Sequence, residues 1–204
     1  NTDFSMSKIF IIAEAGVNHN GDIALAKQLC DAAKAAGADA VKFQTWKTDK
    51  LLLKEAKMAA YQQANTEGYS SQYEMIKKLE LSYDEFMEVK AHCESIGITF
   101  LSTPDEEESL DFLTNQAGIG LIKIGSGEVT NYPFLIRIAR KELPVILSTG
   151  MATLDEVKSA YTTLQQNGAS KITLLHCTSN YPAPFDEINL LAMLTLKEVF
   201  KTAV

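Results

Sequence analysis

The chain has 204 residues, of which 46% are hydrophobic and 22% are charged, proportions that are ordinary for a water-soluble globular domain. Its formal net charge of −7 argues against a general nucleic-acid-binding surface, because contact with phosphate backbones requires a basic face. A small anionic substrate would need only a local positive pocket. No apolar run approaches the roughly 20 residues of a membrane span, and no signal-peptide pattern is seen. We therefore expect neither a nucleic-acid partner nor a membrane partner.

Short apolar runs recur along the chain and predict six β-strands, at residues 9–17, 40–45, 98–104, 121–127, 144–150 and 172–178. Helical patterns alternate with these runs, and such an alternation predicts an α/β fold, either an open doubly wound sheet or a barrel. Every predicted strand ends in polar or charged residues. This favours a TIM (β/α)8 barrel, whose active site collects from the ends of many strands. Residues 1–204 would supply about six βα units, and so an incomplete barrel domain.

Three predicted helices carry capping signals at their N-termini. The first begins after Asp22 and ends near Gly37, with an expected buried face of Leu25, Leu29, Ala33 and Ala36. The other two open with capping boxes, formed by Ser82 with Glu85 and by Thr153 with Glu156. A further helix is expected to open at Thr103 and Pro104, with Glu106, Glu107 and Glu108 in its first turn, and a last helical pattern spans about 187–203.

The segment 47–81 is too long for an ordinary connection between a strand and a helix. Loops on the active face of a barrel supply substrate contacts, so this segment could contribute to a binding site. It could equally be a plain surface excursion, in which Tyr61, Tyr69 and Tyr73 provide its own packing. The sequence leaves both interpretations open.

Polar residues interrupt or follow each predicted strand: Glu14, Lys42, Gln44, Ser102, Thr103, Lys123, Ser126, Glu128, Ser148, Thr149, His176 and Thr178. Two lysines on buried strands, surrounded by hydroxyl groups, indicate a site for a phosphate or a carboxylate. Ser126 also lies between two glycines, whose N–H groups can approach an oxyanion. The alternative is a structural network in which Glu14 and Glu128 only neutralise the two lysines. Burying four ionised groups for stability alone is seldom favourable.

The histidines and cysteines give weaker signals. His92 is expected to be a structural or surface residue, whereas His19 and His176 follow strands on the active face, and the three show no metal-ligand spacing. The cysteines, Cys30, Cys93 and Cys177, are odd in number and far apart, so we expect free thiols and a reducing, cytoplasmic compartment.

Six stretches resemble the sialic acid synthase family, in the same order and from about residue 8 to the end: IIAEAGVNHNGD, VKFQT, FLSTP, KIGSGE, ILSTGM and LLHCTSNYPAPF. The family includes N-acetylneuraminate synthase and the bacterial legionaminic and pseudaminic acid synthases. The resemblance implies a transferase of carbohydrate biosynthesis, built on a TIM barrel. Its partners would be phosphoenolpyruvate and an N-acetylmannosamine-type aldehyde, which condense to a nine-carbon 2-keto sugar acid, N-acetylneuraminate or legionaminate, with release of phosphate.

The resemblance also implies roles for single residues. Lys42, Thr103 and Ser126 match positions that hold the phosphoenolpyruvate carboxylate, and Lys123 and Ser148 match those that hold its phosphate. Glu14, Gln44 and Tyr181 match sugar-contacting positions, and Glu128 matches the acidic residue proposed to handle a proton or water. Lys123 would then be tolerated in an apolar strand because a phosphate meets it.

The sequence departs from the family pattern in several places. The two metal-ligating histidines of the family come from its seventh and eighth strands, so ligands for Mn²⁺ or Mg²⁺ are expected beyond Val204, with no metal ligand in this chain. We also expect the family's C-terminal antifreeze-like domain to be absent from this chain. Asp105 replaces a common Phe, and Ser179 stands where some members carry Asn near the phosphate. We therefore expect residues 1–204 to be part of a synthase and to be inactive alone, and the full-length protein to be a homodimer.

Two alternatives remain at this point. One is a related phosphoenolpyruvate–aldose synthase of the 3-deoxy-heptulosonate type, which shares the barrel, although the NHNGD and YPAPF motifs favour the sialate group. The other is a non-catalytic scaffold that only binds phosphorylated ligands.

Overall fold

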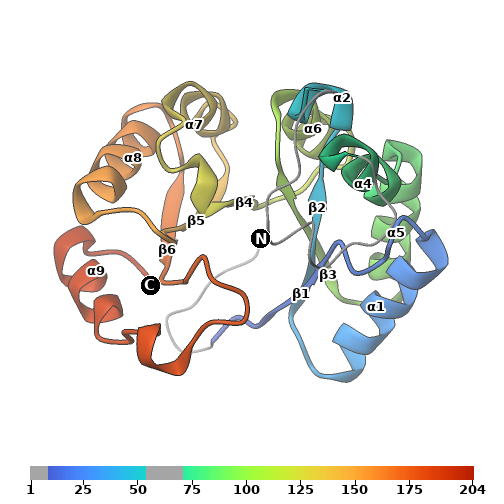
Figure 1. Ribbon diagram of the computed structural model, residues 1–204, viewed down its shortest axis with the longest axis horizontal. Helices are drawn as coiled ribbons and strands as arrows, with labels where there is room; N and C mark the ends of the chain where they lie inside the picture. Colours follow the sequence, from blue (N-terminus) through green and yellow to red (C-terminus); the bar gives the residue numbers. More distant parts are fainter. Residues whose placement is uncertain (1–8, 54–70) are drawn as a thin grey trace. The chain divides into compact units, whose positions relative to one another are not determined.

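The structure, a computed structural model, describes residues 9–53 and 71–204. Its chain forms two compact units, the first ending at Ala117 and the second beginning at Gly118 (Figure 1). Each unit contains one three-stranded sheet, and every strand pair is parallel. The predicted α/β class is thereby confirmed. None of the helices in the described ranges is long and apolar enough to cross a bilayer.

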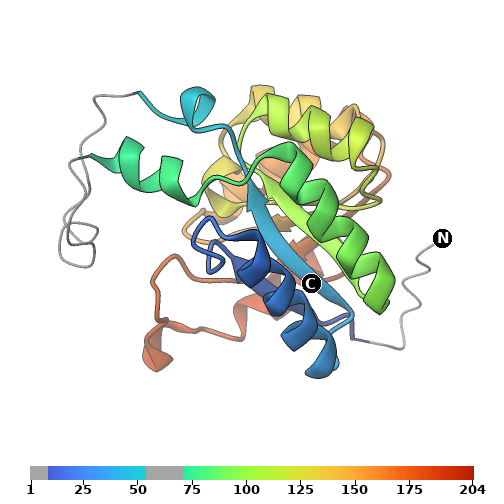
Figure 2. The same cartoon turned by 90° about the vertical axis from the view of Figure 1, so that its right-hand side faces the viewer.

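The first unit contains β1 (Ile12–Gly16), α1 (Ile23–Ala35), β2 (Ala40–Thr45), α2 (Thr48–Leu51), α4 (Gln72–Leu79), α5 (Tyr83–Ile96), β3 (Thr99–Pro104), α6 (Glu107–Asp111) and the π-helical turn η1 (Phe112–Gln116). Its sheet has the order β1-β2-β3. Figure 2 shows α1 and α5 next to each other against this sheet. The Phe43 ring of β2 lies 6.4 Å from that of Phe86 on α5, and 5.9 Å from that of Phe100 on β3. These aromatic contacts identify the sheet face that the helices cover.

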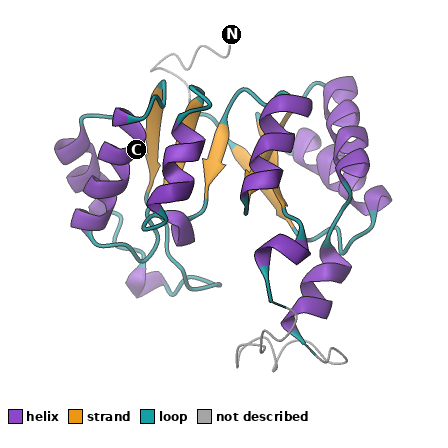
Figure 3. Ribbon diagram, turned by 90° about the horizontal axis from the view of Figure 1, so that it is seen from above, coloured by secondary structure: helices purple, strands orange, loops and turns teal. Residues whose placement is uncertain are grey.

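The second unit contains β4 (Ile122–Ile124), the 3₁₀ turn η2 (Ser126–Glu128), α7 (Tyr132–Ala139), β5 (Pro144–Ser148), α8 (Leu154–Gln166), β6 (Lys171–Leu175), the 3₁₀ turn η3 (Phe185–Glu187) and α9 (Ala192–Phe200). Its sheet has the order β4-β5-β6. Figure 3 distinguishes the strands of each unit, in orange, from the helices beside them, in purple. The helix α7 lies between the fourth and fifth strands, where the sequence patterns give no helix range.

Strand order within each sheet follows the order of the strands along the chain. Each crossover therefore moves to the next position in the same direction. A doubly wound sheet must reverse this direction at a switch point, where its ligand binds. Neither described sheet contains such a reversal. Each unit thus has the strand order that is found in a (β/α) barrel, where each strand lies next to the one that precedes it in the chain.

Local capping predictions agree with the structure where they depend on side chains close in sequence. The Asp22 carboxylate accepts from the Ala24 and Leu25 N–H groups at the start of α1, and both predicted capping boxes are formed, at α5 and α8. The buried face of α1 differs from the prediction. It consists of Ala26, Cys30 and Ala33, whereas Ala36 is exposed. These small side chains let α1 approach α5 closely, and the Cys30 and Cys93 sulfur atoms lie 3.4 Å apart between the two helices.

The predicted start of the helix at Thr103 and Pro104 is wrong. Both residues belong to β3, in register with Gln44 and Thr45 of β2. The helix α6 begins at Glu107, and the carboxylate of Glu106 caps it by accepting from the Glu108 and Ser109 N–H groups. Pairing between strands therefore outweighed the helix-starting preference of the proline.

Two short helices, α2 and α4, occupy the described parts of segment 47–81, while Tyr61 and Tyr69 lie outside the described residues. Glu80 ties the two helices together, because its carboxylate accepts from the Thr48 N–H at 2.8 Å and from the Thr48 hydroxyl at 2.7 Å. Lys77 donates to the same carboxylate at 3.0 Å. The Tyr73 hydroxyl donates to Asp49, which places this tyrosine in the packing of the segment itself.

Next to this junction, the Lys47 ammonium lies 3.9 Å from the centre of the Tyr83 ring. The other neighbour of that ring is Phe112, stacked at 4.0 Å, and burial raises the pKa of Tyr83 to about 12. Burial also opposes ionisation of Glu80, but the Thr48 donors and Lys77 together hold the pKa of Glu80 below its ordinary value. Glu80 is therefore an ionised, hydrogen-bonded anchor for both helices.

Replacing the Glu80 carboxylate by an amide tests how much its charge contributes to stability. We expect Glu80→Gln to lower the free energy of unfolding at pH 7 by about 1–3 kcal/mol, the usual cost of a poorly satisfied buried polar group. Because the pKa of Glu80 is lowered in the folded state, its stabilisation is present above the ordinary carboxyl pKa and is lost as the pH falls through the lowered value. The difference between the variant and the wild type should therefore shrink in acid.

Urea unfolding of both proteins, followed by circular dichroism at pH 7 and at several acidic pH values, measures this difference. Glu198→Gln, at an exposed position of α9, removes the same charge and serves as the control. A pH-independent difference for Glu80→Gln would show that the carboxylate charge contributes nothing to the junction.

Candidate functional site

A polar face of the first sheet carries four of the residues singled out from the sequence. Side chains alternate between the two faces of a strand, so Lys42 and Gln44 point away from the face that holds Phe43. Lys42 is buried, with 7% of its surface exposed, and its ammonium lies 2.8 Å from a Glu14 carboxylate oxygen and 3.0 Å from the Thr103 hydroxyl. Glu14 and Lys42 are direct register partners in β1 and β2. The structure thus brings Glu14, Lys42 and Thr103 into one cluster, with Gln44 on the same face.

The neighbouring pair Thr45 and Ser102 shows that the alternation of side chains between the two faces continues to the end of the strands. Their hydroxyl oxygens are 2.7 Å apart and both residues are fully buried, on the helix-covered side. Ser102, a strand-end residue in the sequence, therefore supports the sheet. The Glu14–Lys42 contact has the form of the neutralising pair considered above, but 54% of the Glu14 side chain is exposed. An exposed carboxylate beside a buried ammonium leaves the cluster accessible to a ligand.

The second sheet carries the second lysine cluster. Lys123 of β4 is buried, with 8% of its surface exposed, and its ammonium donates to the Ser148 hydroxyl at 2.6 Å and to the Ile124 carbonyl at 2.8 Å. Lys123 is in register with Ile146, two residues before Ser148, so the two polar side chains share one face. The predicted pairing of a strand lysine with a hydroxyl group is present here as well.

The loops that follow β4, β5 and β6 converge at Gly150. This residue has a left-handed φ of +48°, and a Cβ atom in its place would lie 2.4 Å from the Ser126 hydroxyl oxygen and 3.1 Å from that of Ser179. Its N–H donates to the Cys177 sulfur at 3.2 Å. Only glycine permits this approach. Gly150 lies within the ILSTGM motif, and its place directly after a predicted strand is the sequence signal for this role.

Glu128 and Tyr181, two further predicted site residues, differ in how firmly they are held. Glu128 ends η2, and its carboxylate accepts from the Asn131 side-chain amide at 2.7 Å. Tyr181 follows β6, and 90% of its surface is exposed. The second unit therefore orients Glu128 but does not bury Tyr181.

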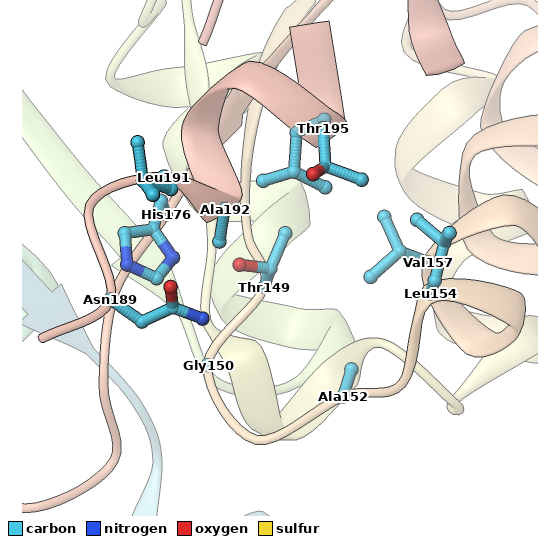
Figure 4. Close-up of a pocket in the computed structure, with 11 residues that line it drawn as sticks. Thr149, Gly150, Ala152, Leu154, Val157, His176, Asn189, Leu191, Ala192 and Thr195 are labelled. Carbon is cyan, nitrogen blue, oxygen red and sulfur yellow. The ribbon is translucent and has the colours of Figure 1, made fainter. Parts of the chain in front are cut away.

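The carboxyl ends of β5 and β6 are hollowed by two cavities of about 380 and 390 Å³. Gly150, His176 and Asn189 line both. In the first, Figure 4 shows His176 and Asn189 at one end, Leu154 and Val157 at the other, and Thr149 between them. Two of its polar side chains have protein partners: one ring nitrogen of His176 lies 2.6 Å from the Ile188 carbonyl oxygen, and the Thr149 hydroxyl donates to the Leu175 carbonyl.

The other two histidines support the fold. His19 is fully buried, its Nδ1 atom accepts from the Gly21 N–H at 3.1 Å, and burial lowers its pKa, so its ring is neutral. It therefore stabilises the conformation of the loop after β1. His92 of α5 lies 2.8 Å from the Asp31 carboxylate of α1, as expected for a structural residue. Within residues 9–53 and 71–204, no three His, Cys, Asp or Glu side chains are grouped so as to hold a metal ion.

Comparison with known proteins decides the family. The sequence model of the NeuB family matches residues 29–204. The chain belongs to the NeuB family. This agrees with the resemblance to sialic acid synthases drawn from the six motifs.

Two curated relatives of this NeuB-family chain are N,N'-diacetyllegionaminic acid synthases. The enzyme of Campylobacter jejuni is 50% identical over 201 residues, which cover 98% of this chain and 60% of the relative. That of Legionella pneumophila is 50% identical over 199 residues, which cover 96% of this chain and 56% of the relative. The chain thus spans a little over half the length of these two proteins.

Solved structures agree with the fold. The crystal structure of N-acetylneuraminic acid synthetase from Leptospira borgpetersenii, in complex with citrate, matches with a TM-score of 0.80 and 31% identity, covering 95% of this chain and 62% of that one. A truncated 3-deoxy-D-arabino-heptulosonate 7-phosphate synthase from Thermotoga maritima matches with a TM-score of 0.57 and 14% identity, covering 83% of this chain and 54% of that one. The second likeness shows the fold alone.

The close contact between Gly150 and Ser126 can be tested by mutation in this NeuB-family chain. Gly150→Ala should cost about 1–2 kcal/mol for the left-handed backbone and about 1–3 kcal/mol more for the clash with Ser126. In a Ser126→Gly background, the clash is removed and only the backbone cost should remain.

Urea unfolding of the two single variants and the double variant measures this coupling. Gly118→Ala is the matched control, because Gly118 has a φ of +63° and a Cβ there would meet nothing within 4 Å. Its cost should be the same with and without Ser126→Gly. Additive costs for Gly150→Ala and Ser126→Gly would contradict the convergence of the two loops.

Proposed function

We propose that the protein condenses phosphoenolpyruvate with an N-acetylmannosamine-type sugar to a nine-carbon 2-keto sugar acid, N-acetylneuraminate or legionaminate, and phosphate. The observation that carries this proposal is the buried Lys123–Ser148 pair, in a chain that is 50% identical to two legionaminic acid synthases over nearly its whole length. A buried ammonium is costly unless an anion or several oxygen atoms meet it. A phosphorylated substrate would add oxygen atoms and negative charge to the two oxygen atoms that the Lys123 ammonium already contacts.

The two parallel sheets, each with its strands in chain order, support a TIM (β/α)8 barrel for the complete domain. Residues 1–204 would supply about six of its βα units. This part of the proposal rests on the strand order within each unit and on the family. From the same resemblance we propose a homodimer, and the three free thiols support a reducing, cytoplasmic compartment.

The roles of the anion-binding residues follow the resemblance and the local geometry of each unit. Lys42 and Thr103, which already share a hydrogen bond, would hold the phosphoenolpyruvate carboxylate together with Ser126. Lys123 and Ser148 would hold its phosphate. In each cluster an ammonium and a hydroxyl group are arranged to donate to the same anion, and charge-assisted bonds of this kind are the strong ones.

The sugar would contact Glu14, Gln44 and Tyr181. C3 of the enol phosphate forms a bond to the aldehyde carbon, and the aldehyde oxygen takes up a proton and becomes a hydroxyl group of the product. Water adds to C2, with Glu128 taking its proton as a general base. The tetrahedral intermediate then breaks its C2–O bond to phosphate, the C2 hydroxyl group gives its proton to the departing phosphate, and the 2-keto group remains.

The family also implies a divalent metal, Mn²⁺ or Mg²⁺. The residues in the described part of the chain do not fit such an ion, because no three potential ligands are grouped there. We assign no step of the reaction to a metal held by these residues.

A coupled assay of phosphate release tests the proposed function. The complete translation product of the reading frame that encodes the chain should release phosphate from phosphoenolpyruvate when N-acetylmannosamine or its diacetamido analogue is added with Mn²⁺. The ratio of the two rates identifies the preferred sugar. If phosphate is released with neither sugar, the proposed condensation is wrong.

Binding of phosphoenolpyruvate tests the anion site separately. Lys123→Met should weaken binding by roughly 2–5 kcal/mol, because it removes a charge-assisted bond from a desolvated anion. Isothermal calorimetry measures the affinity, with Lys197→Met on the exposed surface of α9 as the control. Equal affinities for the wild type and Lys123→Met would remove Lys123 from the site.

Glu128→Gln should leave folding and phosphoenolpyruvate binding intact and lower turnover by about 10²-fold or more, as expected for loss of a general acid–base group. The phosphate-release assay gives kcat, and calorimetry on the same sample gives the affinity. Turnover near that of the wild type would exclude Glu128 from the mechanism.

A further inference from the structure

The carboxylate assigned to water activation lies on a short, tightly closed connection. Between β4 and α7, the Glu128 N–H donates to the Gly125 carbonyl at 3.1 Å, and the Asn131 N–H donates to the Glu128 carbonyl at 3.0 Å. Val129, between them, is buried with 1% of its surface exposed. The backbone that carries Glu128 is therefore fixed. Its side chain still has three rotatable bonds, which this backbone does not restrain.

Asn131 supplies the missing restraint. Its Nδ2 atom donates to Glu128 Oε2 at 2.7 Å, and its Oδ1 atom accepts from the Phe134 N–H at 3.4 Å as the N-cap of α7. The two bonds need opposite ends of the amide, so together they fix which way the amide group faces. The helix that Asn131 caps is itself anchored by four buried side chains, Phe134, Leu135, Ile138 and Ala139.

We propose that Asn131 is a positioning residue for the Glu128 carboxylate, joining one of its oxygen atoms to the rigid N-terminus of α7. This inference rests on the proposed role of Glu128 in the reaction. With Oε2 held by the amide, Oε1 is the oxygen that accepts the proton of the attacking water. Asn131 takes no part in bond making in this proposal. It sets the direction in which the base points, and a neutral amide does so without neutralising the carboxylate charge.

The capping role and the positioning role can be separated by one substitution. Asn131→Asp keeps an N-cap of equal quality, because an Asp carboxylate accepts from the same N–H group. It removes the donor to Glu128 and places a like charge beside that carboxylate. Asn131→Ala removes the cap and the donor together. Asn131→Asp therefore retains the cap while it changes the surroundings of the Glu128 carboxylate.

We expect Asn131→Asp to unfold at the same temperature as the wild type or higher, and to lower kcat by about 10-fold or more, with little change in KM for phosphoenolpyruvate. A like charge disfavours the ionised form of a neighbouring carboxylate, so the acidic limb of the pH–kcat profile should move to higher pH. Asn131→Ala should lower both the unfolding temperature and kcat. Asn115→Asp, at an exposed position of η1, adds the same charge and should leave both kcat and the profile unchanged.

A measurement that does not depend on turnover follows the Asn131 side-chain amide by NMR. Its two proton resonances should move when the Glu128 carboxylate is titrated with acid, and this movement should vanish in Glu128→Gln. Wild-type kcat and an unshifted pH profile in Asn131→Asp would overturn the inference, even where Glu128→Gln is inactive. If the wild-type protein releases no phosphate, the proposed function fails. The NMR titration of the Asn131 amide then tests the positioning role by itself. Amide proton resonances that do not move during the acid titration would overturn that role.

Discussion

Each sheet of this protein holds a lysine ammonium that has been removed from water, and much of the surrounding structure serves to meet that charge with oxygen atoms. Strand alternation places Lys42 opposite Glu14 and beside Thr103, while Phe43, one residue later, enters the helix-covered side. In the second sheet Lys123 reaches Ser148 and a backbone carbonyl. A shift of either strand by one residue would expose the core aromatic or aliphatic side chains and bury the ammonium among them.

Around Lys123, the polar groups are supplied by the loops as well as by the strands. Gly150 lets three strand-end loops approach one another, and the Ser126 and Ser179 hydroxyl groups meet against its bare Cα. Glu128 follows immediately on the first of these loops and is joined to α7 through Asn131. The proposed binding groups and the carboxylate proposed as the general base are thus carried by connections only a few residues long. Short connections between rigid elements give the precise geometry that a reaction between two bound substrates requires.

The sequence was most informative where a signal is local, and least informative where the register between strands decides. The capping boxes at Ser82 and Thr153 join residues three positions apart, and both were predicted correctly. The bond between Lys42 and Thr103 spans 61 positions, so their grouping at strand ends could be expected but their contact could not. At Thr103 a helix-starting pattern competed with strand pairing, and the long-range pairing prevailed. The Asn131–Glu128 contact, also three positions apart, carried a local signal: a capping residue just before a proline in the first turn of a helix.

The two thiols between α1 and α5 have a practical consequence. Cys30 and Cys93 are fully buried with their sulfur atoms 3.4 Å apart, whereas Cys177 is partly accessible. An alkylating reagent therefore reaches the first two only after the helix pair has opened, and the third without any opening. Because local opening reactions differ in free energy across a protein, the rate at which Cys30 and Cys93 are labelled reports the opening of the first unit directly. Cys177 supplies an internal standard for the reagent in the same sample.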